Sequence, residues 1–419
     1  MNPLPKTLAP VYALLAGTGI LLLGNGLLST LTPVRADLQQ FGSFWIGWIG
    51  AAYFAGFIVG CYVCPPLVSR VGHIRVFAAL AAAASAVPLL QVMALYPGAW
   101  IGLRAVVGFC FAGLYMVIES WLNDIATRAT RGTIFSAYMI VNLVALAAGQ
   151  YLLVVADPAM PEPFLLVGIL TAFALIPVAL TRASAPPAPV QAAPRLRRLY
   201  RLSPVGFVGC VLVGMSNGAF WSLSAVYARE VGLSYIGIAV FMSAAIIGGA
   251  LIQWPLGRIS DSINDRRKLI AIVCGGAVLL SLVLIFGKQL PGFSLYGVAF
   301  LFGSAVFSLY GLCVAHANDH AEPDDFVQVS ASLLLVFGAG ATVGPVLASS
   351  IMQVAGNVYL FAVVAVIQVA MMGYVLYRMR RREAIQPEDR ESYVATTRTS
   401  PELFALDPRS QEEAEAPAE

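Results

Sequence analysis

The feature that most constrains the fold of this chain is a series of twelve apolar segments, each long enough to cross a lipid bilayer. A helix needs about 20 mostly apolar residues to span the roughly 30 Å hydrocarbon core. Backbone groups there must hydrogen-bond within helices or a closed barrel, and apolar runs that are continuous rather than alternating indicate helices. The predicted spans are 10–33, 45–68, 76–96, 99–122, 134–155, 163–181, 204–228, 236–257, 269–287, 294–315, 328–353 and 358–377.

Composition and charge agree with an all-α membrane protein and give its orientation. Charged residues make up only 11% of the chain, against about 25% in soluble domains. Eighteen lysines and arginines near the spans lie on one side, against three on the other, namely Arg35, Arg229 and Lys288. Because cytoplasmic loops carry the excess of basic residues, we expect both termini in the cytoplasm. The net charge of +3 then reflects topology and is no sign of nucleic-acid binding.

The chain divides into two halves with a linker and a tail. Residues 182–203 are rich in Pro and Ala and then basic, which is typical of a cytoplasmic linker between a bundle at 1–181 and a second bundle at 204–382. Residues 383–419 carry ten acidic residues and few apolar ones. Such a composition cannot bury enough apolar surface to fold, so we expect a disordered acidic cytoplasmic tail.

The two halves repeat each other. At a shift of 192 residues Asn25-Gly26 meets Asn217-Gly218, and Gly56 meets Gly248. At a shift of 195, Gly108 meets Gly303, Leu114-Tyr115 meets Leu309-Tyr310, and Gly149 meets Gly344. Duplicated halves place a binding site at their interface near the membrane midplane. The repeat therefore predicts two pseudo-symmetric six-helix bundles around a central site.

A polar loop motif occurs once in each half. The run after the 236–257 span reads Gly257-Arg-Ile-Ser-Asp-Ser-Ile-Asn-Asp-Arg-Arg-Lys268, and its counterpart is Pro65-Pro-Leu-Val-Ser-Arg-Val-Gly-His-Ile-Arg75. Here the chain resembles the major facilitator superfamily, whose signature at this place is G-x-L-x-D-R-x-G-R-[RK]. The resemblance covers nearly all of residues 1–380. It implies a monomeric secondary transporter of a small molecule in a bacterial inner membrane, working by alternating access.

We expect these loops to form a cytoplasmic latch, because an Asp can stabilise a helix N-terminus and arginines can pair with acids at helix ends. The first copy has Ser69 where the second has Asp261. We therefore expect the first latch to hold the helix ends together less firmly. The alternative is simple positive-inside charge with no gating role. The candidate gate residues are Ser69, Arg70, Arg75, Asp124, Arg258, Asp261, Asp265 and Arg266.

The 99–122 span carries the second signature, R-x-x-x-G at Arg104 and Gly108. An arginine inside a span costs about 2.5–3.5 kcal/mol at the helix centre, so Arg104 should face the bundle interior. Glu119 lies on the same helix face and is the only carboxylate we place inside a span. It is the candidate proton-coupling residue. The alternative is a structural salt bridge to Arg131 or to a latch arginine.

Polar and aromatic residues at matching places suggest a cavity. In the superfamily the first and fourth helices of each half line it, which would place Tyr115 opposite Tyr310. The alternative for each polar residue is hydrogen-bonding glue between helices. The candidate cavity residues are Asn25, Ser29, Arg104, Tyr115, Asn142, Gln150, Asn217, Trp221 and Tyr310.

Other motifs narrow the function. The 144–151 stretch lacks the proline of drug/proton antiporters, and Val117-Ile-Glu-Ser120 and Gln253-Trp-Pro-Leu-Gly257 look closest to the YcaD-like branch of the superfamily. We find no nucleotide-binding loop, no membrane-depth cluster of catalytic groups, and expect no cofactor or metal; His316-x-x-x-His320 suits helix-end capping. The sequence predicts a non-enzymatic, proton-coupled carrier; an efflux antiporter or a non-transporting receptor on the same scaffold remains the alternative.

Overall fold

The computed structural model describes residues 9–127, 129–180, 194–321 and 326–383, together with Pro186, Ile385, Arg390, Tyr393, Thr399 and Ser400. Its first half contains α1 (Ala9–Leu38), α2 (Gly42–Val71), α3 (His73–Met93), α4 (Pro97–Ile125), α5 (Arg131–Tyr151), η2 (Leu152–Val154), α6 (Glu162–Phe173) and α7 (Leu175–Ala179). Its second half contains α8 (Leu196–Leu202), α9 (Pro204–Glu230), α10 (Tyr235–Leu251), α11 (Gln253–Ser262), α12 (Arg266–Ile285), η3 (Gly287–Gln289), α13 (Gly292–Asn318), α14 (Phe326–Ala355), η5 (Asn357–Tyr359) and α15 (Leu360–Met379).

The predicted all-α fold is confirmed: the described residues hold twelve helical segments apolar and long enough to span a membrane, and no strand. Two spans are interrupted where a proline follows. The sixth breaks after Phe173 and the eighth after Leu251, each four residues before Pro177 or Pro255. Proline has no backbone N–H for the carbonyl four residues earlier, so the helix is interrupted there. The break in the eighth span sets off α11, which carries the second loop motif.

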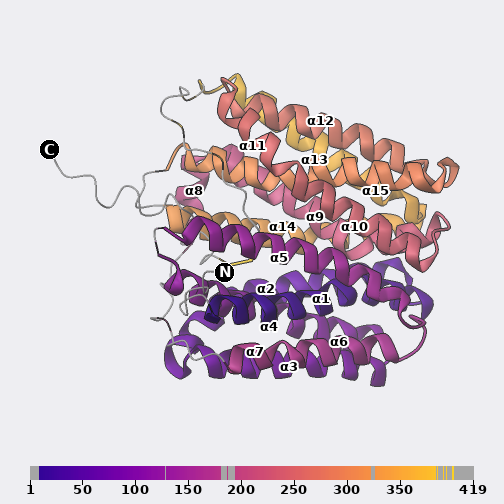
Figure 1. Cartoon of the computed structure of the whole chain (residues 1–419). Helices are drawn as coiled ribbons and strands as arrows, with labels where there is room; N and C mark the ends of the chain where they lie inside the picture. Colours follow the sequence, from indigo (N-terminus) through magenta and orange to yellow (C-terminus); the bar gives the residue numbers. More distant parts are fainter. Residues whose placement is uncertain are drawn as a thin grey trace, which may run out of the picture.

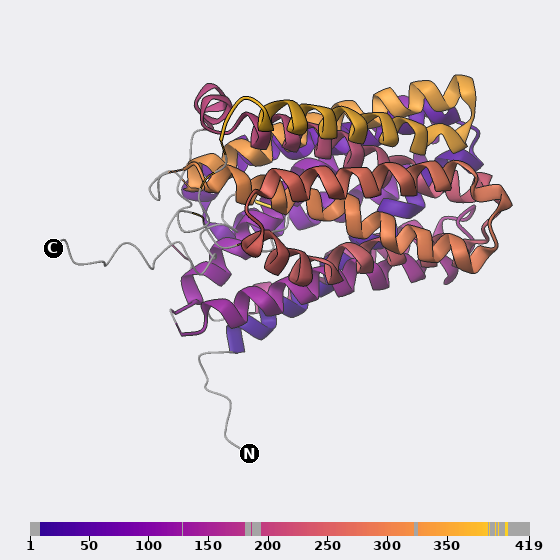
Figure 2. The ribbon, with the colours of Figure 1, turned by 90° about the horizontal axis from the view of Figure 1, so that it is seen from above.

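The helices form two bundles that lie side by side, the first half in indigo to purple and the second in pink to yellow (Figure 1). Seen at right angles, the helices run along one common direction (Figure 2). We call the end where α1 begins and α15 ends the terminal face. The opposite end, which holds the 39–41 and 231–234 turns, is the far face.

Repeated glycines bring equivalent helices together in both halves. A Cβ added at Gly56 or Gly108 would lie 1.9 Å from a backbone carbonyl oxygen of the facing helix, so α2 and α4 touch backbone to backbone. The equivalent Gly248 and Gly303 do the same for α10 and α13, at 2.0 Å. Small residues permit such approach in membranes, where packing rather than hydrophobicity holds helices together.

The second repeated pair joins the central helices of each half. Gly26 and Gly149 let α1 and α5 meet, with Cβ positions 2.6 and 2.4 Å from facing carbonyl oxygens. Gly218 and Gly344 do so for α9 and α14, at 2.3 and 2.0 Å. The sequence repeat therefore corresponds to equivalent helix contacts in both bundles.

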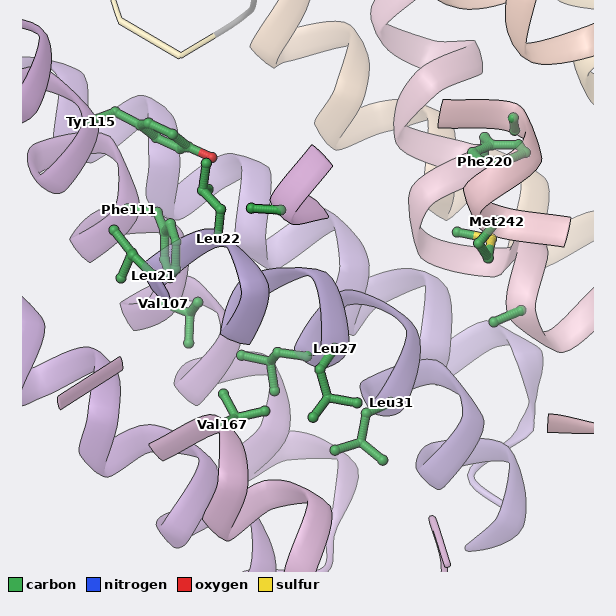
Figure 3. Packing of buried hydrophobic residues seen from close by; sticks show 14 of the residues in the cluster. Leu21, Leu22, Leu27, Leu31, Val107, Phe111, Tyr115, Val167, Phe220 and Met242 are labelled. Atoms are coloured by element: carbon green, nitrogen blue, oxygen red, sulfur yellow. The ribbon is translucent and has the colours of Figure 1, made fainter. Parts of the chain in front are cut away.

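Large apolar side chains fill the space beside these contacts. In the first bundle Leu27 and Leu31 of α1 lie with Val107 of α4 and Val167 of α6, all fully buried or nearly so (Figure 3). Phe220 and Met242 form the corresponding core in the second bundle, where the Phe220 ring stacks on Phe302 at 5.6 Å. Apolar packing of this kind thus fills the interior of both halves.

Replacement of Gly108 by leucine should destabilise the first bundle by about 1–3 kcal/mol, because the side chain must push α2 away from α4. The matched control is Gly102→Leu on the same helix, where a Cβ meets nothing within 4 Å. Thermal unfolding of the purified protein in detergent would show a lower Tm for the first variant alone. Equal Tm values for both variants would contradict the close helix contact.

Candidate functional site

A cavity of about 270 Å³ lies between the two bundles. Its lining comes from α1, α2, α4 and α5 of the first half and from α9, α10, α13 and α14 of the second, with Gln253 of α11. These are equivalent helices of the repeat, while no lining residue belongs to α3, α6, α12 or α15. The cavity is thus a shared space between two pseudo-symmetric walls.

Among the described residues that line the cavity, Arg104 is the only charged one. Its side chain is 7% exposed, and its guanidinium lies over the ring of Tyr53, 5.0 Å from the ring centroid. Within the described part of the chain, its Nε and Nη1 atoms are buried and have no hydrogen-bond partner, and it forms no ion pair. The cavity therefore contains an uncompensated positive charge next to an aromatic face.

Aromatic rings make up much of the remaining wall. Trp221 of α9 stacks on Phe307 of α13 with ring centroids 5.8 Å apart and planes at 11°. In the first half Phe57 of α2 lies against Tyr115 of α4 at 6.5 Å. Tyr53, Phe57 and Phe307 were missed by the sequence analysis. The i, i+4 spacing of Tyr53 and Phe57 on a glycine-rich helix was the available signal.

The structure brings six of the nine predicted cavity residues together. The residues that line the cavity are Asn25, Ser29, Arg104, Tyr115, Asn142 and Trp221. The other three, Gln150, Asn217 and Tyr310, are not among its lining residues.

Those three residues are held in helix packing instead. Gln150 donates from Nε2 to the Gly26 carbonyl oxygen at 3.0 Å, which fastens α5 to α1. Tyr310 packs on Phe337 with ring centroids 5.2 Å apart. Asn217 of α9 is fully buried and precedes Gly218, the residue at which α9 contacts α14. The alternative interpretation, that a polar residue only hydrogen-bonds two helices together, fits Gln150 best.

Glu119 is fully buried beyond the cavity wall, toward the terminal face. The Tyr138 hydroxyl of α5 donates to its Oε1 at 2.5 Å, and the Ser400 hydroxyl donates to its Oε2. Asn142 lies one turn from Tyr138 on α5 and lines the cavity. A chain of polar side chains thus leads from the carboxylate to the cavity. Tyr138 and Ser400 were not predicted as partners.

The far face is closed by contacts between the two halves. Asp37 of α1 forms an ion pair with Arg229 of α9. The Ser43 hydroxyl donates to Oδ1 of Asn357 at 2.6 Å, and the Phe44 N–H donates to Oε1 of Gln353 at 3.3 Å. At the other end the cavity lining includes Pro194 and Thr399, so the cavity extends toward the terminal face.

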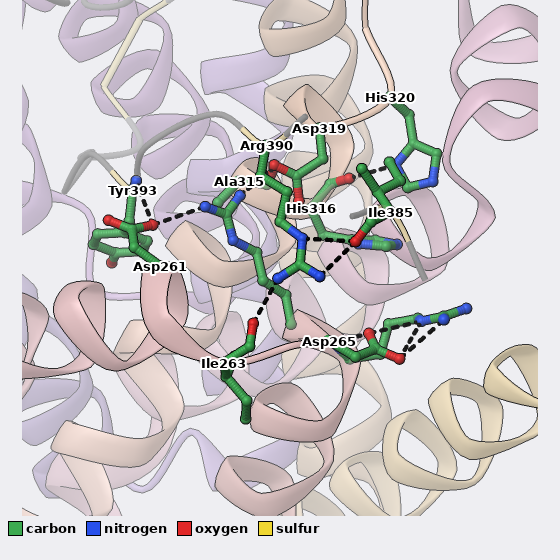
Figure 4. A network of polar contacts seen from close by, with 12 residues as sticks. Asp261, Ile263, Asp265, Ala315, His316, Asp319, His320, Ile385, Arg390 and Tyr393 are labelled. Atoms are coloured by element: carbon green, nitrogen blue, oxygen red, sulfur yellow. Dashed lines mark hydrogen bonds and ion pairs between the residues drawn. The ribbon is translucent and has the colours of Figure 1, made fainter. Parts of the chain in front are cut away.

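The second loop motif forms a buried ion-pair network (Figure 4). Arg266 is 2% exposed and donates to Asp261 at 2.8 Å and to Asp319 at 2.5 Å, which joins α11, α12 and α13. Asp265 caps α12 by accepting from the Arg267 N–H at 2.9 Å. Arg258 stands apart, with its guanidinium 3.8 Å from the ring centroid of Trp254.

The first loop motif has no such network. Ser69 donates only to the nearby Pro66 carbonyl oxygen at 2.9 Å. Arg70, Arg75 and Asp124 are exposed, and the structure shows no ion pair for them within its described ranges. The difference agrees with the expectation that a serine in place of the aspartate weakens this copy.

The histidine and cysteine pairs form no evident metal site. The Nδ1–H of His320 donates to the His316 carbonyl oxygen, 2.9 Å away, and burial lowers the pKa of His320. In the part of the chain that is described, no three His, Cys, Asp or Glu side chains gather as metal ligands, and Cys61 and Cys64 are free thiols.

Described residues of the 383–419 region contact the bundle, which differs from the expectation of disorder at those positions. The Tyr393 N–H donates to Asp261 Oδ1 at 2.9 Å, and Arg390 donates to the Ile263 carbonyl oxygen at 2.6 Å (Figure 4). Thr399 lines the cavity, and Thr399 and Ser400 are 6% and 1% exposed. The other residues of the expected tail and most of the expected linker before Pro194 lie outside the described residues.

Comparison with known proteins agrees with the architecture. The model of the Major Facilitator Superfamily matches residues 14–331. An uncharacterized MFS-type transporter of Yersinia pestis and the uncharacterized MFS-type transporter YcaD of Escherichia coli are each 27% identical over 364 residues, which cover 85% of this chain and 92% of theirs. The crystal structure of the nucleoside transporter NupG superposes with a TM-score of 0.75 at 13% identity, covering 89% of this chain and 100% of the other.

Replacement of Arg266 by glutamine should lower the stability of the second bundle by about 3 kcal/mol, because Asp319 is left buried without its counter-ion. Arg75→Gln is the matched control, since Arg75 is exposed, has no ion pair among the described residues, and such charges contribute little. Thermal unfolding in detergent distinguishes the two. A Tm for Arg266→Gln equal to that of the control would show that the network does not hold the helix ends.

Proposed function

The chain belongs to the major facilitator superfamily, and on that premise we propose that it is a proton-coupled secondary transporter of a small solute. The observation that carries this proposal is the cavity shared by the two bundles. A space lined by equivalent helices of two rigid halves can open to either side when the halves rock against each other.

The contacts at the two ends support alternating access. The far face is held shut by Asp37–Arg229 and by the Ser43–Asn357 hydrogen bond, all between different halves. These are a few polar contacts that can break and re-form, while each bundle keeps its own glycine-packed core. Rocking would exchange the far-face contacts for contacts at the terminal face.

The distribution of basic residues supports the orientation that we propose. In the sequence, eighteen lysines and arginines fall in the segments that flank the spans on the side of the predicted linker, against three, Arg35, Arg229 and Lys288, on the other side. By the positive-inside rule, the terminal face would lie in the cytoplasm of a bacterial inner membrane. The cavity in this conformation would then be reached from inside the cell.

Glu119 is the group that we propose to carry the proton. It is the one carboxylate buried at membrane depth among the described residues, and a charged carboxylate there is costly unless it is hydrogen-bonded. Tyr138 holds it at 2.5 Å and stands next to Asn142 at the cavity wall. Protonation of Glu119 would weaken that contact, and this links a proton to the packing of α4 on α5.

Purified protein in liposomes, given a mixture of small metabolites and an imposed pH gradient, should accumulate at least one solute as measured by mass spectrometry. Glu119→Gln should reduce this gradient-driven uptake to the level of empty liposomes, because glutamine cannot bind or release the proton. Exchange of labelled for unlabelled solute should continue, since no net proton movement is needed.

Glu162→Gln is the control, because Glu162 is an exposed carboxylate at the start of α6; it should transport as the unmodified protein does. If uptake by Glu119→Gln keeps its pH dependence, Glu119 is structural and the coupling group lies elsewhere. If no solute crosses in either mode, the transporter proposal itself is wrong.

A further inference from the structure

The surroundings of Arg104 favour the binding of an anionic ligand. It is the single charge among the described residues of the cavity wall, it is 7% exposed, and no described carboxylate pairs with it. A buried guanidinium with unused N–H groups is destabilising unless a ligand or water accepts its hydrogen bonds. Its planar donors match a carboxylate in a bidentate manner.

The cavity wall opposite Arg104 favours a ligand whose remaining part is flat and apolar. Trp221 and Phe307 stack on each other at 5.8 Å on the second half, while Arg104 and Tyr53 lie on the first. A solute with its acid group at Arg104 and its ring against Trp221 would contact both bundles. Such a ligand could hold the halves in one relative position, which a carrier requires for coupling binding to rocking.

The volume limits the size of this ligand. About 270 Å³ is at the low end for small-molecule pockets, and a single cation does not neutralise several negative charges. Resting on the proposed transport function, we infer that the substrate class is small organic monoanions, in particular carboxylates with an aromatic or branched apolar body.

Three probes with one aromatic body test the head-group preference: 3-phenylpropionate, 3-phenylpropionamide and 3-phenylpropylamine. Binding is measured by calorimetry and by protection of Cys61, which lines the cavity, from a water-soluble maleimide; the other five cysteines are buried. The anion should bind about tenfold or more tightly than the amide, and the amine should bind least.

Arg104→Gln should remove the preference for the anion, Arg104→Lys should retain part of it, and Trp221→Ala should weaken all three probes alike. Equal binding of anion and amide, or an unchanged preference in Arg104→Gln, would overturn the inference. Because these readouts are binding, they fail independently of transport: tight anion binding without flux would refute the carrier and leave the ligand class intact.

A separate set of contacts concerns the C-terminal region. The ring of Tyr393 lies against two glycines that leave room for it, since a Cβ at Gly257 or Gly311 would come within 2.6 or 2.4 Å of its atoms. Its N–H reaches Asp261, and Arg390 reaches the Ile263 carbonyl oxygen. This segment is therefore seated on the loop motif of the second half.

Two described residues further along the chain, Thr399 and Ser400, contact the cavity and the first half. Thr399 lines the cavity and Ser400 hydrogen-bonds Glu119 of α4. One segment thus contacts the loop motif of one half, the cavity and the candidate coupling carboxylate of the other half.

We propose that Arg390, Tyr393, Thr399 and Ser400 act as an intramolecular inhibitor through these contacts. By bridging the halves at the terminal face it would oppose their relative motion. By occupying the hydrogen-bonding position on Glu119 it would oppose proton exchange. Release of this segment would then activate the protein without any change in the cavity.

Two shortened chains separate this role from a general effect of the tail. A chain ending after Arg382 lacks the four contacts, whereas a chain ending after Ser400 keeps them and loses only the last residues. In liposomes, Cys61 should react with an impermeant maleimide from the terminal face about fivefold faster in the first form, and at the full-length rate in the second.

The point variants Tyr393→Ala and Ser400→Ala should each give part of the increase, and they guard against misfolding of the truncated chain. A synthetic peptide of residues 383–400 should slow labelling of the shortest form again. Equal labelling rates for both shortened chains and for Tyr393→Ala would overturn the proposal.

Discussion

The contact on which the rest of this structure depends is the approach of helix backbones at glycine. Lipid offers helices no hydrophobic reason to associate, so close packing must hold each bundle. Gly56 with Gly108, and Gly248 with Gly303, provide this at equivalent places in the two halves. The polar residues that we propose as functional lie between the halves and at their ends.

Three buried charged residues of this fold differ in the partners that surround them. Arg266 is buried and paired with two carboxylates at a helix end, where it fixes α11, α12 and α13. Arg104 is buried in the cavity with unused donors, where it is available to a ligand. Glu119 lies between these extremes, hydrogen-bonded by the hydroxyl groups of Tyr138 and Ser400. Hydroxyl contacts are weaker than a buried salt bridge and easier to exchange.

Much of this organisation could be predicted from the sequence. Apolar length gave the twelve spans, and the repeat identified glycines that prove to be equivalent contacts. Ser69 stands where the second copy has Asp261, and among the described residues an ion pair is found at Asp261, whereas Ser69 donates to the Pro66 carbonyl oxygen; that the first copy is the weaker latch stays a prediction. The cavity was only partly predictable, because Asn217 satisfies the same repeat as Asn25 but is fully buried outside the cavity lining. Which face a neighbouring helix covers depends on tertiary packing. The role of Tyr393 could not be foreseen either, since its two glycine neighbours lie far away in sequence.

The ion pair between Asp37 and Arg229 has a consequence for the environment of the protein. Both side chains are 28% exposed, so dissolved ions reach them, and the screening distance falls from about 10 Å at 0.1 M salt to about 3 Å at 1 M. Concentrated salt therefore weakens this closure at the far face, while the glycine-packed interior of each bundle is unaffected. In the alternating-access cycle that we propose, salt in the medium on the far side would therefore shift the balance between the two open forms.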